Sequence, residues 1–330
     1  MRQTVLLLLL FCGCLFSDGP IDFVFTWVDG SDPAWAAKKD FYMEKEPPTT
    51  KEGISPCRFR NHNELKYALR SINDFAPFVR YIFIVTDDQK PSWLKNHSKV
   101  RLVSHKEIFL EKKDLPSFNS SAIESHVHRI AGLSEKYVYC NDDFFLGRRV
   151  SPADFFTEDG KIKIFETERE IPSILTKDQS NDSVMRRAWN TSRSLKSVYG
   201  DDKRHFFLYH IPYVMRKSLV QKSERMFPRV FEKVSADRFR SANSYRITCC
   251  LIQYVGLYSD LAKQCHADYY FFPYQSNIAC DRAHMKNILE KKPMFFCVQD
   301  EEITEIHEDA EQALTQFFET YFPLPAPWES

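Results

Sequence analysis

The sequence predicts an α/β fold in which a largely parallel sheet is flanked by helices. Four near-continuous apolar stretches, each bounded by polar residues, are typical of strands that are covered on both faces. They are residues 21–28, 81–86, 100–103 and 137–140. Helical patterns lie between these stretches, and strands that alternate with helices indicate a parallel sheet.

Two of the intervening segments have the apolar spacing of an amphipathic helix. The apolar positions are Leu65, Leu69 and Ile72 within residues 62–73, and Ile123, Val127 and Ile130 within residues 120–133. Intervals of three or four residues place such side chains on one face of a helix. We therefore expect each segment to be a helix that buries this face against the sheet.

The pattern of polar and apolar residues changes at about residue 158. This change divides the chain into an α/β half (20–157) and a second half (158–330). The second half is richer in helical patterns than in long apolar stretches, so we expect a mostly helical C-terminal lobe. The helical candidates are residues 214–222, 247–259 and 308–321. The polar stretch 178–193 is expected to be a surface excursion, with a mobile lid as the alternative.

The first 19 residues are typical of a secretory signal peptide. Their apolar run, from Val5 to Phe16, is shorter than the roughly 20 residues of a membrane-spanning helix. Cleavage is therefore favoured over an uncleaved anchor, which would be the only route to membrane association. N-glycosylation tripeptides begin at Asn96, Asn119, Asn181 and Asn190. They are compatible with the lumen of the secretory pathway (Golgi or endoplasmic reticulum) or with secretion, and in a bacterium the signal would predict the cell envelope.

The charge balance argues against nucleic acid and anionic membrane surfaces as partners. Lys and Arg number 45, as do Asp and Glu, so the formal net charge is zero. The 330 residues include 9 glycines and neither GxGxxG nor GxxxxGK(S/T), which argues against the phosphate-binding loops of dinucleotide-binding and P-loop proteins. Phosphate groups must then be bound by local clusters of side chains.

The cysteine pattern predicts some disulfides and no structural zinc site. Outside the signal segment the cysteines are Cys57, Cys140, Cys249, Cys250, Cys265, Cys280 and Cys297. Their number is odd, so at least one thiol stays free. No CxxC pair occurs, and we expect a partial set of disulfides concentrated in the last third of the chain.

Acidic residues follow three of the four predicted strands. They lie within residues 29–32, 87–88 and 141–143. Because the carboxyl ends of parallel strands meet at one edge of a sheet, we expect these groups to converge there. The carboxylates of Asp142 and Asp143 suit Mg²⁺ or Mn²⁺, which keep open positions for diphosphate oxygens. The alternative is a turn whose acids cap backbone amides.

The predicted helix upstream of this turn offers further polar groups. Glu124 and His128 are four residues apart and share a helix face. Ser121 and Glu124 also fit a capping box, in which Glu124 would do no chemistry. His126 and His128 are alternative metal ligands, and together with Asp142 they would suit a metal-dependent phosphodiesterase.

Basic side chains for a diphosphate must come from elsewhere in the chain, since a guanidinium binds phosphate oxygens through paired hydrogen bonds. The candidates are Arg58, Arg60, Arg70, His210, Arg216, Arg238 and Arg240. The composition of the chain does not indicate which of these residues bind phosphate. We expect Arg70 to contact the substrate, together with Asn141 beside the acidic turn.

Several stretches of the chain resemble, in family order, the signature sequences of the Stealth family of hexose-1-phosphate transferases. They are 21–35 (IDFVFTWVDGSDPAW), 58–72 (RFRNHNELKYALRSI), 76–93 (APFVRYIFIVTDDQKPSW), the block 115–155, Ser194 to Gly200, Tyr209-His210-Ile211-Pro212, Arg238-Phe239-Arg240, and 292–300 (KPMFFCVQD) with the terminal FPLPAPWE. The resemblance covers almost the whole chain after the signal segment. Tyr213 stands where the bacterial pattern usually has a second histidine.

The resemblance implies an α/β core like that of nucleotide-sugar transferases, with residues 20–157 binding the nucleotide sugar and residues 158–330 completing the active site. It also implies a UDP-sugar donor, commonly UDP-N-acetylglucosamine, a glycan acceptor, and Mg²⁺ or Mn²⁺. The implied site comprises a uridine-side loop (Thr26, Trp27 and Asp29), two active-site acids (Glu124 and Asp143) and two phosphate-facing basic residues (His210 and Arg240).

The reaction implied by the resemblance transfers a sugar 1-phosphate from the UDP-sugar to a hydroxyl of the glycan and releases UMP. We expect Asp143, with Asp142, to hold the metal, and Glu124 or His210 to act as the general base. One alternative is a conventional glycosyltransferase, which would release UDP. Another is a catalytically silent glycan-binding relative, which the tyrosine at position 213 suggests.

Overall fold

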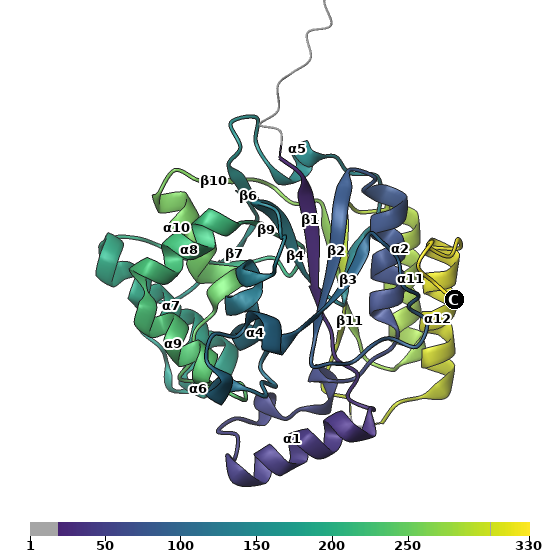
Figure 1. The fold of residues 1–330 in the computed structure, drawn as a ribbon, viewed down its shortest axis with the longest axis horizontal. Coiled ribbons are helices and arrows are strands. Elements are labelled where there is room, and N and C mark those ends of the chain that lie inside the picture. The colour runs from purple at the N-terminus through teal and green to yellow at the C-terminus, as the bar shows by residue number, and fades with distance from the viewer. Residues whose placement is uncertain (1–18, 304) are drawn as a thin grey trace, which may run out of the picture.

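The computed structural model describes residues 19–303 and 305–330, in which strands and helices alternate along the first half of the chain (Figure 1). The strands are β1 (Ile21–Thr26), β2 (Val79–Thr86), β3 (Val100–Ser104), β4 (Lys136–Asn141), β5 (Phe144–Leu146), β6 (Ile162–Ile164), β7 (Glu166–Glu170), β8 (Phe206–Leu208), β9 (Tyr213–Arg216), β10 (Ala262–Gln264), β11 (Tyr269–Tyr274) and β12 (Phe295–Asp300). The α-helices are α1 (Pro33–Lys45), α2 (Glu64–Phe75), α3 (His105–Ile108), α4 (Ser120–His126), α5 (Pro152–Phe155), α6 (Lys177–Asn181), α7 (Ser183–Tyr199), α8 (Lys217–Met226), α9 (Pro228–Ala236), α10 (Ile252–Tyr258), α11 (Ile278–Lys291) and α12 (Glu308–Tyr321).

The central sheet has the strand order β3-β2-β1-β4-β9. The four predicted strands are β1 to β4; they pair in parallel, whereas β9 is antiparallel to β4. In Figure 1, α2, α11 and α12 lie on one side of this sheet and α4, α8 and α10 lie on the other. The predicted α/β fold with a largely parallel sheet flanked by helices is therefore confirmed.

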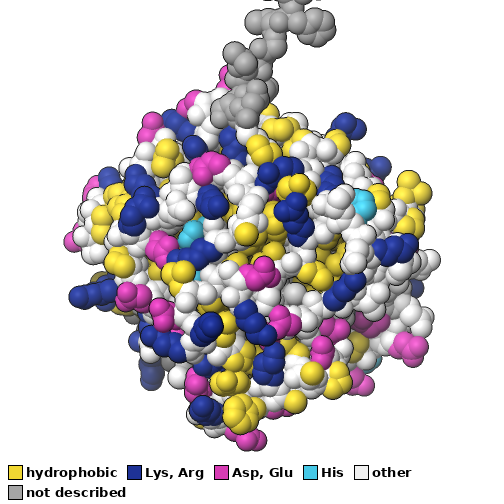
Figure 2. Space-filling view, in the orientation of Figure 1, with side chains coloured by type: hydrophobic (Ala, Val, Ile, Leu, Met, Phe, Trp, Pro, Cys, Tyr) yellow, Lys and Arg dark blue, Asp and Glu magenta, His cyan; other side chains and the backbone are white. Residues whose placement is uncertain are grey.

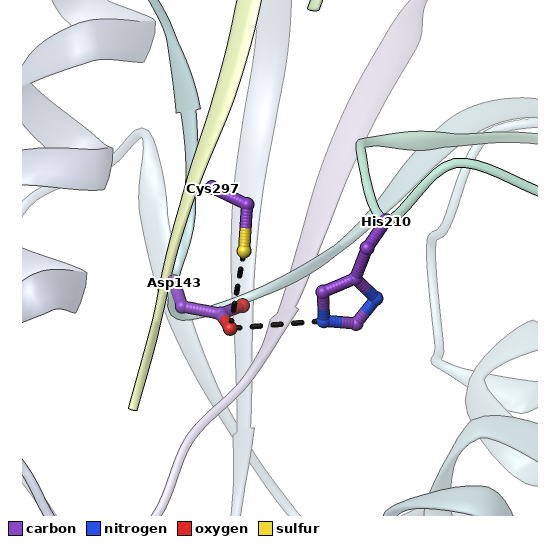
Figure 3. Close-up of side chains that lie close together, drawn as sticks. All are labelled: Asp143, His210 and Cys297. Atoms are coloured by element: carbon purple, nitrogen blue, oxygen red, sulfur yellow. Dashed lines mark hydrogen bonds and ion pairs between the residues drawn. The ribbon is translucent and has the colours of Figure 1, made fainter. Parts of the chain in front are cut away.

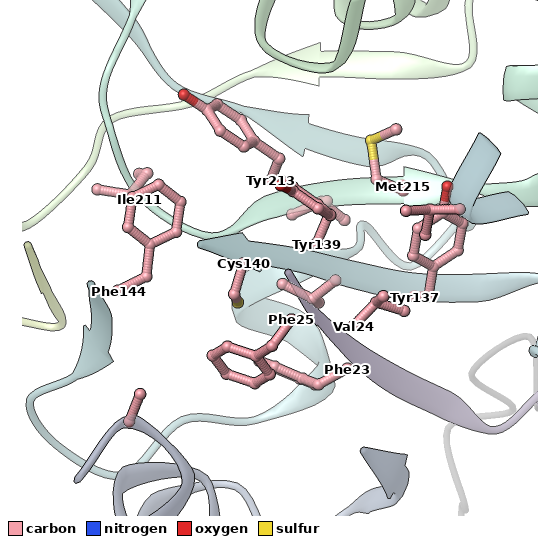
Figure 4. Packing of buried hydrophobic residues seen from close by; sticks show 14 of the residues in the cluster. Phe23, Val24, Phe25, Tyr137, Tyr139, Cys140, Phe144, Ile211, Tyr213 and Met215 are labelled. Atoms are coloured by element: carbon pink, nitrogen blue, oxygen red, sulfur yellow. The ribbon is translucent and has the colours of Figure 1, made fainter. Parts of the chain in front are cut away.

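Aromatic and aliphatic side chains fill the space between the sheet and its helices, as Figure 4 shows for β1, β4 and β9. Phe23 and Phe25 of β1 are fully buried, as are Tyr137 and Tyr139 of β4. In the ladder between these strands, Phe25 pairs with Cys140. Burial of both faces explains why these strands read as continuous apolar stretches.

The two predicted helices of the first half are present, although one is shorter than expected. Leu65, Leu69 and Ile72 all lie on the buried face of α2. The second helix, α4, ends at His126 and continues as a 3-10 turn over Val127–Arg129.

The second half contains short strands as well as helices, and two local predictions there are wrong. The segment 214–222 begins as strand β9, which joins the central sheet, before α8 starts at Lys217. The stretch 178–193 is helical, forming parts of α6 and α7, and is not a surface excursion. Its polar residues mislead because several of them are buried in α7, where Thr191, for example, donates to the carbonyl of Arg187.

The seven described cysteines are all free thiols, so the predicted partial set of disulfides is not found among the residues that the structure describes. Cys140, Cys250 and Cys297 are buried, and Cys140 and Cys250 pack as small apolar side chains. The predicted signal peptide lies outside the described residues but for Gly19. No helix within the described part of the chain is long and apolar enough to cross a membrane. Figure 2 shows basic and acidic side chains interspersed on one face, as the balanced composition implies.

Arg70, which we predicted to contact substrate, instead fixes the C-terminal segment to α2. It is 3% exposed, and its guanidinium donates to both carboxylate oxygens of Glu329 at 2.8 and 2.7 Å. It also donates to Glu319 at 3.0 Å and to the carbonyl of Phe322 at 2.7 Å. The residue is therefore a structural clamp.

Replacing Arg70 with Met should lower the free energy of unfolding by about 3 kcal/mol. The carboxylate of Glu329, itself 6% exposed, would lose both guanidinium hydrogen bonds and, of its ion pairs, keep only the longer one with Lys66 at 3.8 Å. The matched control is Arg148→Met, which breaks an exposed ion pair with Asp268 and should cost less than about 1 kcal/mol. Urea denaturation of both variants measures the difference. Equal midpoints would contradict the structural role of Arg70.

Candidate functional site

A cavity of about 700 Å³ opens at the carboxyl ends of β1, β2 and β4 and is lined by residues of both halves of the chain. Of the predicted site residues, Thr26, Trp27, Glu124, Asn141, Asp142, Asp143, His210 and Arg240 line it. Asp87, at the end of β2, lines it as well. The parallel strands thus bring two of the three predicted acidic ends to one place, as expected for this kind of sheet.

Asp29 and Arg70 do not line the cavity. Arg70 belongs to the clamp described above. The carboxylate of Asp29 accepts hydrogen bonds from the backbone and the hydroxyl of Ser31, at 3.0 and 2.6 Å. The backbone of Asp29 also forms two hydrogen bonds with the amide side chain of Gln89. In this structure Asp29 therefore shapes the loop after β1.

The same loop is held against the segment that contains Arg58 and Arg60. The backbone amide of Gly30 donates to the carbonyl of Phe59 at 2.8 Å. A Cβ atom at Gly30 would lie 2.4 Å from that oxygen, so only glycine allows this approach. The glycine therefore lets the loop after β1 pack against the segment 58–60, which begins at the end of a 3-10 helix and lines the cavity.

A chain of side-chain contacts connects β1 with His210. The hydroxyls of Thr26 and Tyr139 are 2.7 Å apart, and Tyr139 donates to Asn141 Oδ1 at 3.0 Å. Asn141 Nδ2 lies 3.4 Å from His210 Nε2. The ring of His210 also meets the ring of Phe144 edge to face, with centroids 4.6 Å apart. Neighbouring strands thereby fix the position of the imidazole.

Asp143 lies between His210 and Cys297, as Figure 3 shows. Its Oδ2 is 3.7 Å from His210 Nε2 and accepts a hydrogen bond from Cys297 Sγ at 3.4 Å. One potential ligand atom from each of the three residues falls within 4.8 Å of the others. Asp143 Oδ1 is buried and has no hydrogen-bond partner among the described residues.

Further carboxylates crowd around this point, and together they form the acidic cluster (Glu64, Asp142, Asp143 and Asp300). Burial, with the charges of Glu64 and Asp143, raises the pKa of Asp142 well above its usual value. Burial also raises the pKa of Glu64. Asp300 shares one oxygen between Arg60 and His62, and its other oxygen is buried without a partner among the described residues.

The acidic cluster fits a divalent cation. Oxygen ligands suit Mg²⁺ and Mn²⁺. The repulsion among the carboxylates and the buried, unpartnered oxygen of Asp143 are what a bound cation would relieve. Asp143 and Asp142 would hold the ion, with His210 next to them.

A basic cluster (Arg58, Arg187 and Arg240, with Glu52 among them) lines another part of the cavity. Glu52 Oε1 accepts from Arg187 at 2.6 Å and from Arg240 at 3.2 Å, and Arg58 is 3.8 Å away. Ser183 also donates to Glu52. Burial, together with Arg58 and Arg187, lowers the pKa of Arg240 to about 10. One carboxylate thus faces three guanidinium groups, which leaves positive charge for an anion.

Glu124 lies on α4 and does not cap that helix. The cap is Asn119, whose side chain accepts from the backbone amide of Ser121 at 3.2 Å, so the capping-box interpretation is wrong. Burial raises the pKa of Glu124, although Thr248 and Arg240 act in the opposite direction. Thr248 lies in a π-helix over Ile247–Leu251, a distortion often found at functional sites.

His126 and His128 do not line the cavity, which removes the ligands of the phosphodiesterase alternative. Both side chains are buried. His126 Nε2 lies 3.0 Å from the hydroxyl of Ser235, and His128 Nε2 lies 3.2 Å from the carboxylate of Glu224. These partners belong to α8 and α9, so both histidines join α4 and its following turn to the second half of the chain.

Several cavity residues are absent from the predicted site. They are Glu52, Glu64, Arg187, Arg246 and Asp300. Asp300 ends the apolar strand β12 just as Asn141 ends β4, so the same strand-end rule would have found it. Arg187 lies within a polar helix and carries no comparable signal. Of the other basic candidates, Arg58 and Arg60 line the cavity, whereas Arg216 and Arg238 pair elsewhere with Glu135 and Glu46.

Comparison with known proteins gives curated relatives along most of the chain. An exopolysaccharide phosphotransferase of Streptomyces coelicolor is 36% identical over 313 residues, which are 94% of this chain and 51% of the relative. The exopolysaccharide phosphotransferase CpsY of Mycobacterium tuberculosis is 36% identical over 313 residues, 94% of this chain and 58% of the relative. That of Nocardia farcinica is 35% identical over 312 residues and is covered to 61%. The chain therefore spans a little more than half the length of these relatives.

A solved structure of the galactosyltransferase LgtC, in complex with donor and acceptor sugar analogues, has a TM-score of 0.45 and 12% identity. The match covers 93% of this chain and 98% of that one, and it is too distant to bear on function. The models of four conserved regions of Stealth proteins match in order: region 1 at 19–47, region 2 at 58–164, region 3 at 209–257 and region 4 at 286–330. These matches confirm the resemblance seen in the sequence motifs, and the chain belongs to the Stealth family.

Proposed function

We propose that the chain transfers a sugar 1-phosphate, N-acetylglucosamine 1-phosphate, from a UDP-sugar to a hydroxyl of a glycan and releases UMP. The observation that carries the proposal is the presence of the acidic and basic clusters in one cavity. A diphosphate with its counter-cation needs both kinds of group within reach. The relatives' names as exopolysaccharide phosphotransferases support transfer of a phosphate-linked sugar to a polysaccharide.

The cation is assigned to Asp143 and Asp142, with Mg²⁺ or Mn²⁺ as the ion. When bound, it would neutralise charge on the phosphate oxygens and so stabilise the transition state. The uridine side of the donor is assigned to Thr26 and Trp27, which line the cavity at the end of β1. Asn141 holds His210 beside the carboxylates.

In the proposed reaction the acceptor oxygen attacks the β-phosphorus, which carries the sugar. The bond from that phosphorus to the bridging oxygen breaks, and UMP leaves with the electron pair. The proton of the acceptor hydroxyl passes to Glu124 or to His210. Arg240 and Arg187 bind the phosphate oxygens, so that positioning and charge neutralisation supply most of the acceleration.

The nucleotide product tests this proposal directly. The purified chain is incubated with UDP-N-acetylglucosamine, Mg²⁺ or Mn²⁺ and a panel of glycans, and the nucleotides are separated by chromatography. We expect UMP. Release of UDP would instead indicate attack at the anomeric carbon by a conventional glycosyltransferase, and donor binding without either product would indicate a silent glycan-binding relative.

Asp143→Asn should lower the rate of UMP release by about 10² or more, because one cation ligand loses its charge. It should also weaken binding of Mn²⁺ to the chain alone, measured by calorimetric titration. The matched control is Asp88→Asn, which removes an exposed carboxylate paired with Lys106 outside the cavity. A folded Asp143→Asn chain with unchanged turnover and Mn²⁺ affinity would refute the metal role.

Glu124→Gln should lower the turnover number by about 10² to 10⁴ if Glu124 is the general base. A base works only when deprotonated, and burial raises the pKa of this carboxyl. Wild-type turnover should therefore fall, as the pH is lowered, at a pH above the ordinary glutamate value of about 4.3. The pH profile of turnover for the variant should lack this decrease at low pH.

The positive charges of Arg240 and Arg246 oppose the effect of burial on the pKa of Glu124. The turnover and pH profile of Glu124→Gln are compared with those of His210→Gln, which removes the other candidate base. If His210→Gln shows the larger loss and Glu124→Gln retains near-normal turnover with the decrease at low pH intact, His210 is the base.

A further inference from the structure

One wall of the cavity is aromatic and lies outside both charged clusters. Phe207 belongs to β8 and Tyr209 follows that strand, while Tyr269 and Phe271 belong to β11. Because side chains alternate along an extended strand, residues two apart point to the same side, so each segment contributes a pair of rings. The ring centroids of Tyr209 and Tyr269 are 5.1 Å apart, at an interplanar angle of 54°. We call these four residues the aromatic wall.

The aromatic wall lies at the edge of the hydrophobic core, against which Phe207, Tyr209 and Tyr269 pack without being fully buried. Phe271 is 37% exposed, and the other three rings are half-buried. The alternate residues of β11, Phe272 and Tyr274, are fully buried and already fill the space behind the strand. Large rings that face an open cavity on such a strand are typical of a ligand-binding surface.

The aromatic wall begins at the proposed reaction centre. Tyr209 precedes His210 in the sequence, and Phe271 pairs with Cys297 in the parallel ladder between β11 and β12. Cys297 in turn donates to Asp143. A molecule lying on the wall is therefore within reach of this carboxylate and imidazole, and the exposed Phe271 leaves part of the wall open to solvent.

We propose that the aromatic wall binds the sugar rings of the acceptor glycan, an inference that rests on the proposed function. A pyranose ring has an apolar face of C–H groups that packs on an aromatic ring, while its hydroxyls at the ring edge need polar partners. The wall supplies both, since two of its rings carry hydroxyls and the guanidinium of Arg169 lies 4.6 Å from the centre of Phe207.

The nucleobase of the donor is the competing occupant of these rings. The loop after β1 supplies a separate ring, Trp27, together with Val28 and the nearby Asp87 and His105, and these line the cavity beside the ends of β1 and β2. The base is assigned there, which leaves the aromatic wall, built from the second half of the chain, for the acceptor.

The test uses Phe271→Ala and Phe271→Leu in the full chain, with Phe41→Ala as the control. Phe41 is 59% exposed on α1 and does not line the cavity. Binding of maltotetraose, cellotetraose and chitotetraose to the chain alone is measured by calorimetry, as is binding of UDP-N-acetylglucosamine. We expect at least one oligosaccharide to bind the wild type, and both Phe271 variants to weaken that binding about tenfold, as truncation of a buried aromatic anchor does.

Donor affinity and thermal midpoint should remain at the wild-type values in both variants, and the control should match the wild type throughout. The leucine variant keeps an apolar side chain without a flat ring, so its loss of binding would not reflect a folding defect. The inference is overturned if none of the three oligosaccharides binds the wild type, if Phe271→Ala binds sugar normally, or if donor affinity falls in parallel. Sugar binding that depends on Phe271 in a chain that never releases UMP would contradict the proposed function alone.

Discussion

The site depends on an acidic cluster and a basic cluster that occupy different parts of one cavity. Burying a charge without a partner is costly. The acids nevertheless crowd at the end of β4, where the pKa of Asp142 is raised, and the guanidinium groups crowd around Glu52, where the pKa of Arg240 is lowered. Each pKa shift indicates that the buried charges on that side of the cavity are not fully compensated by neighbouring groups of opposite charge. A cation and a diphosphate, entering together, would supply what both sides lack.

The fold prevents the two clusters from neutralising each other. Asp142 and Asp143 follow β4, in the rigid sheet, whereas Arg187 lies on α7 and Arg240 follows α9. The strand β12 runs antiparallel to β5, and the pairing of Cys297 with Phe144 places Cys297 next to Asp143. Because the charges are carried by separate elements, their distance is set by backbone packing and not by side-chain attraction.

The architecture of the first half was predictable because its signals are local. Continuous apolar strands, helical spacing and acidic strand ends are all visible in the sequence, and they place Asp142 and Asp143 at the cavity. The motifs of the resemblance added His210 and Arg240, which lie far from β4 in sequence. The prediction that Arg70 contacts the substrate failed because the position of a residue in a motif does not reveal that the C-terminal Glu329 is its partner.

Residues whose function depends on distant partners could not be found in this way. Glu52 lies in a short 3-10 helix over Lys51–Gly53, and its importance arises only when α7 brings Arg187 to it. The polar composition of α7 indicated a surface segment, because hydrogen bonds between buried polar groups are invisible before the packing is known. Strands of three or four residues, such as β8 and β9, are likewise too short to show a period.

The tyrosine at position 213 bears on whether the site is active. Tyr213 is 7% exposed, lines the cavity and packs against Phe144 with ring centroids 5.9 Å apart. His210 is held by Asn141 on one side and by the edge of Phe144 on the other. The position of His210 thus rests on Asn141 and Phe144, and Tyr213 contacts the same phenylalanine ring. With tyrosine at position 213, where the resemblance predicts a second histidine, His210 still lies 3.7 Å from Asp143, which supports the proposed transferase activity.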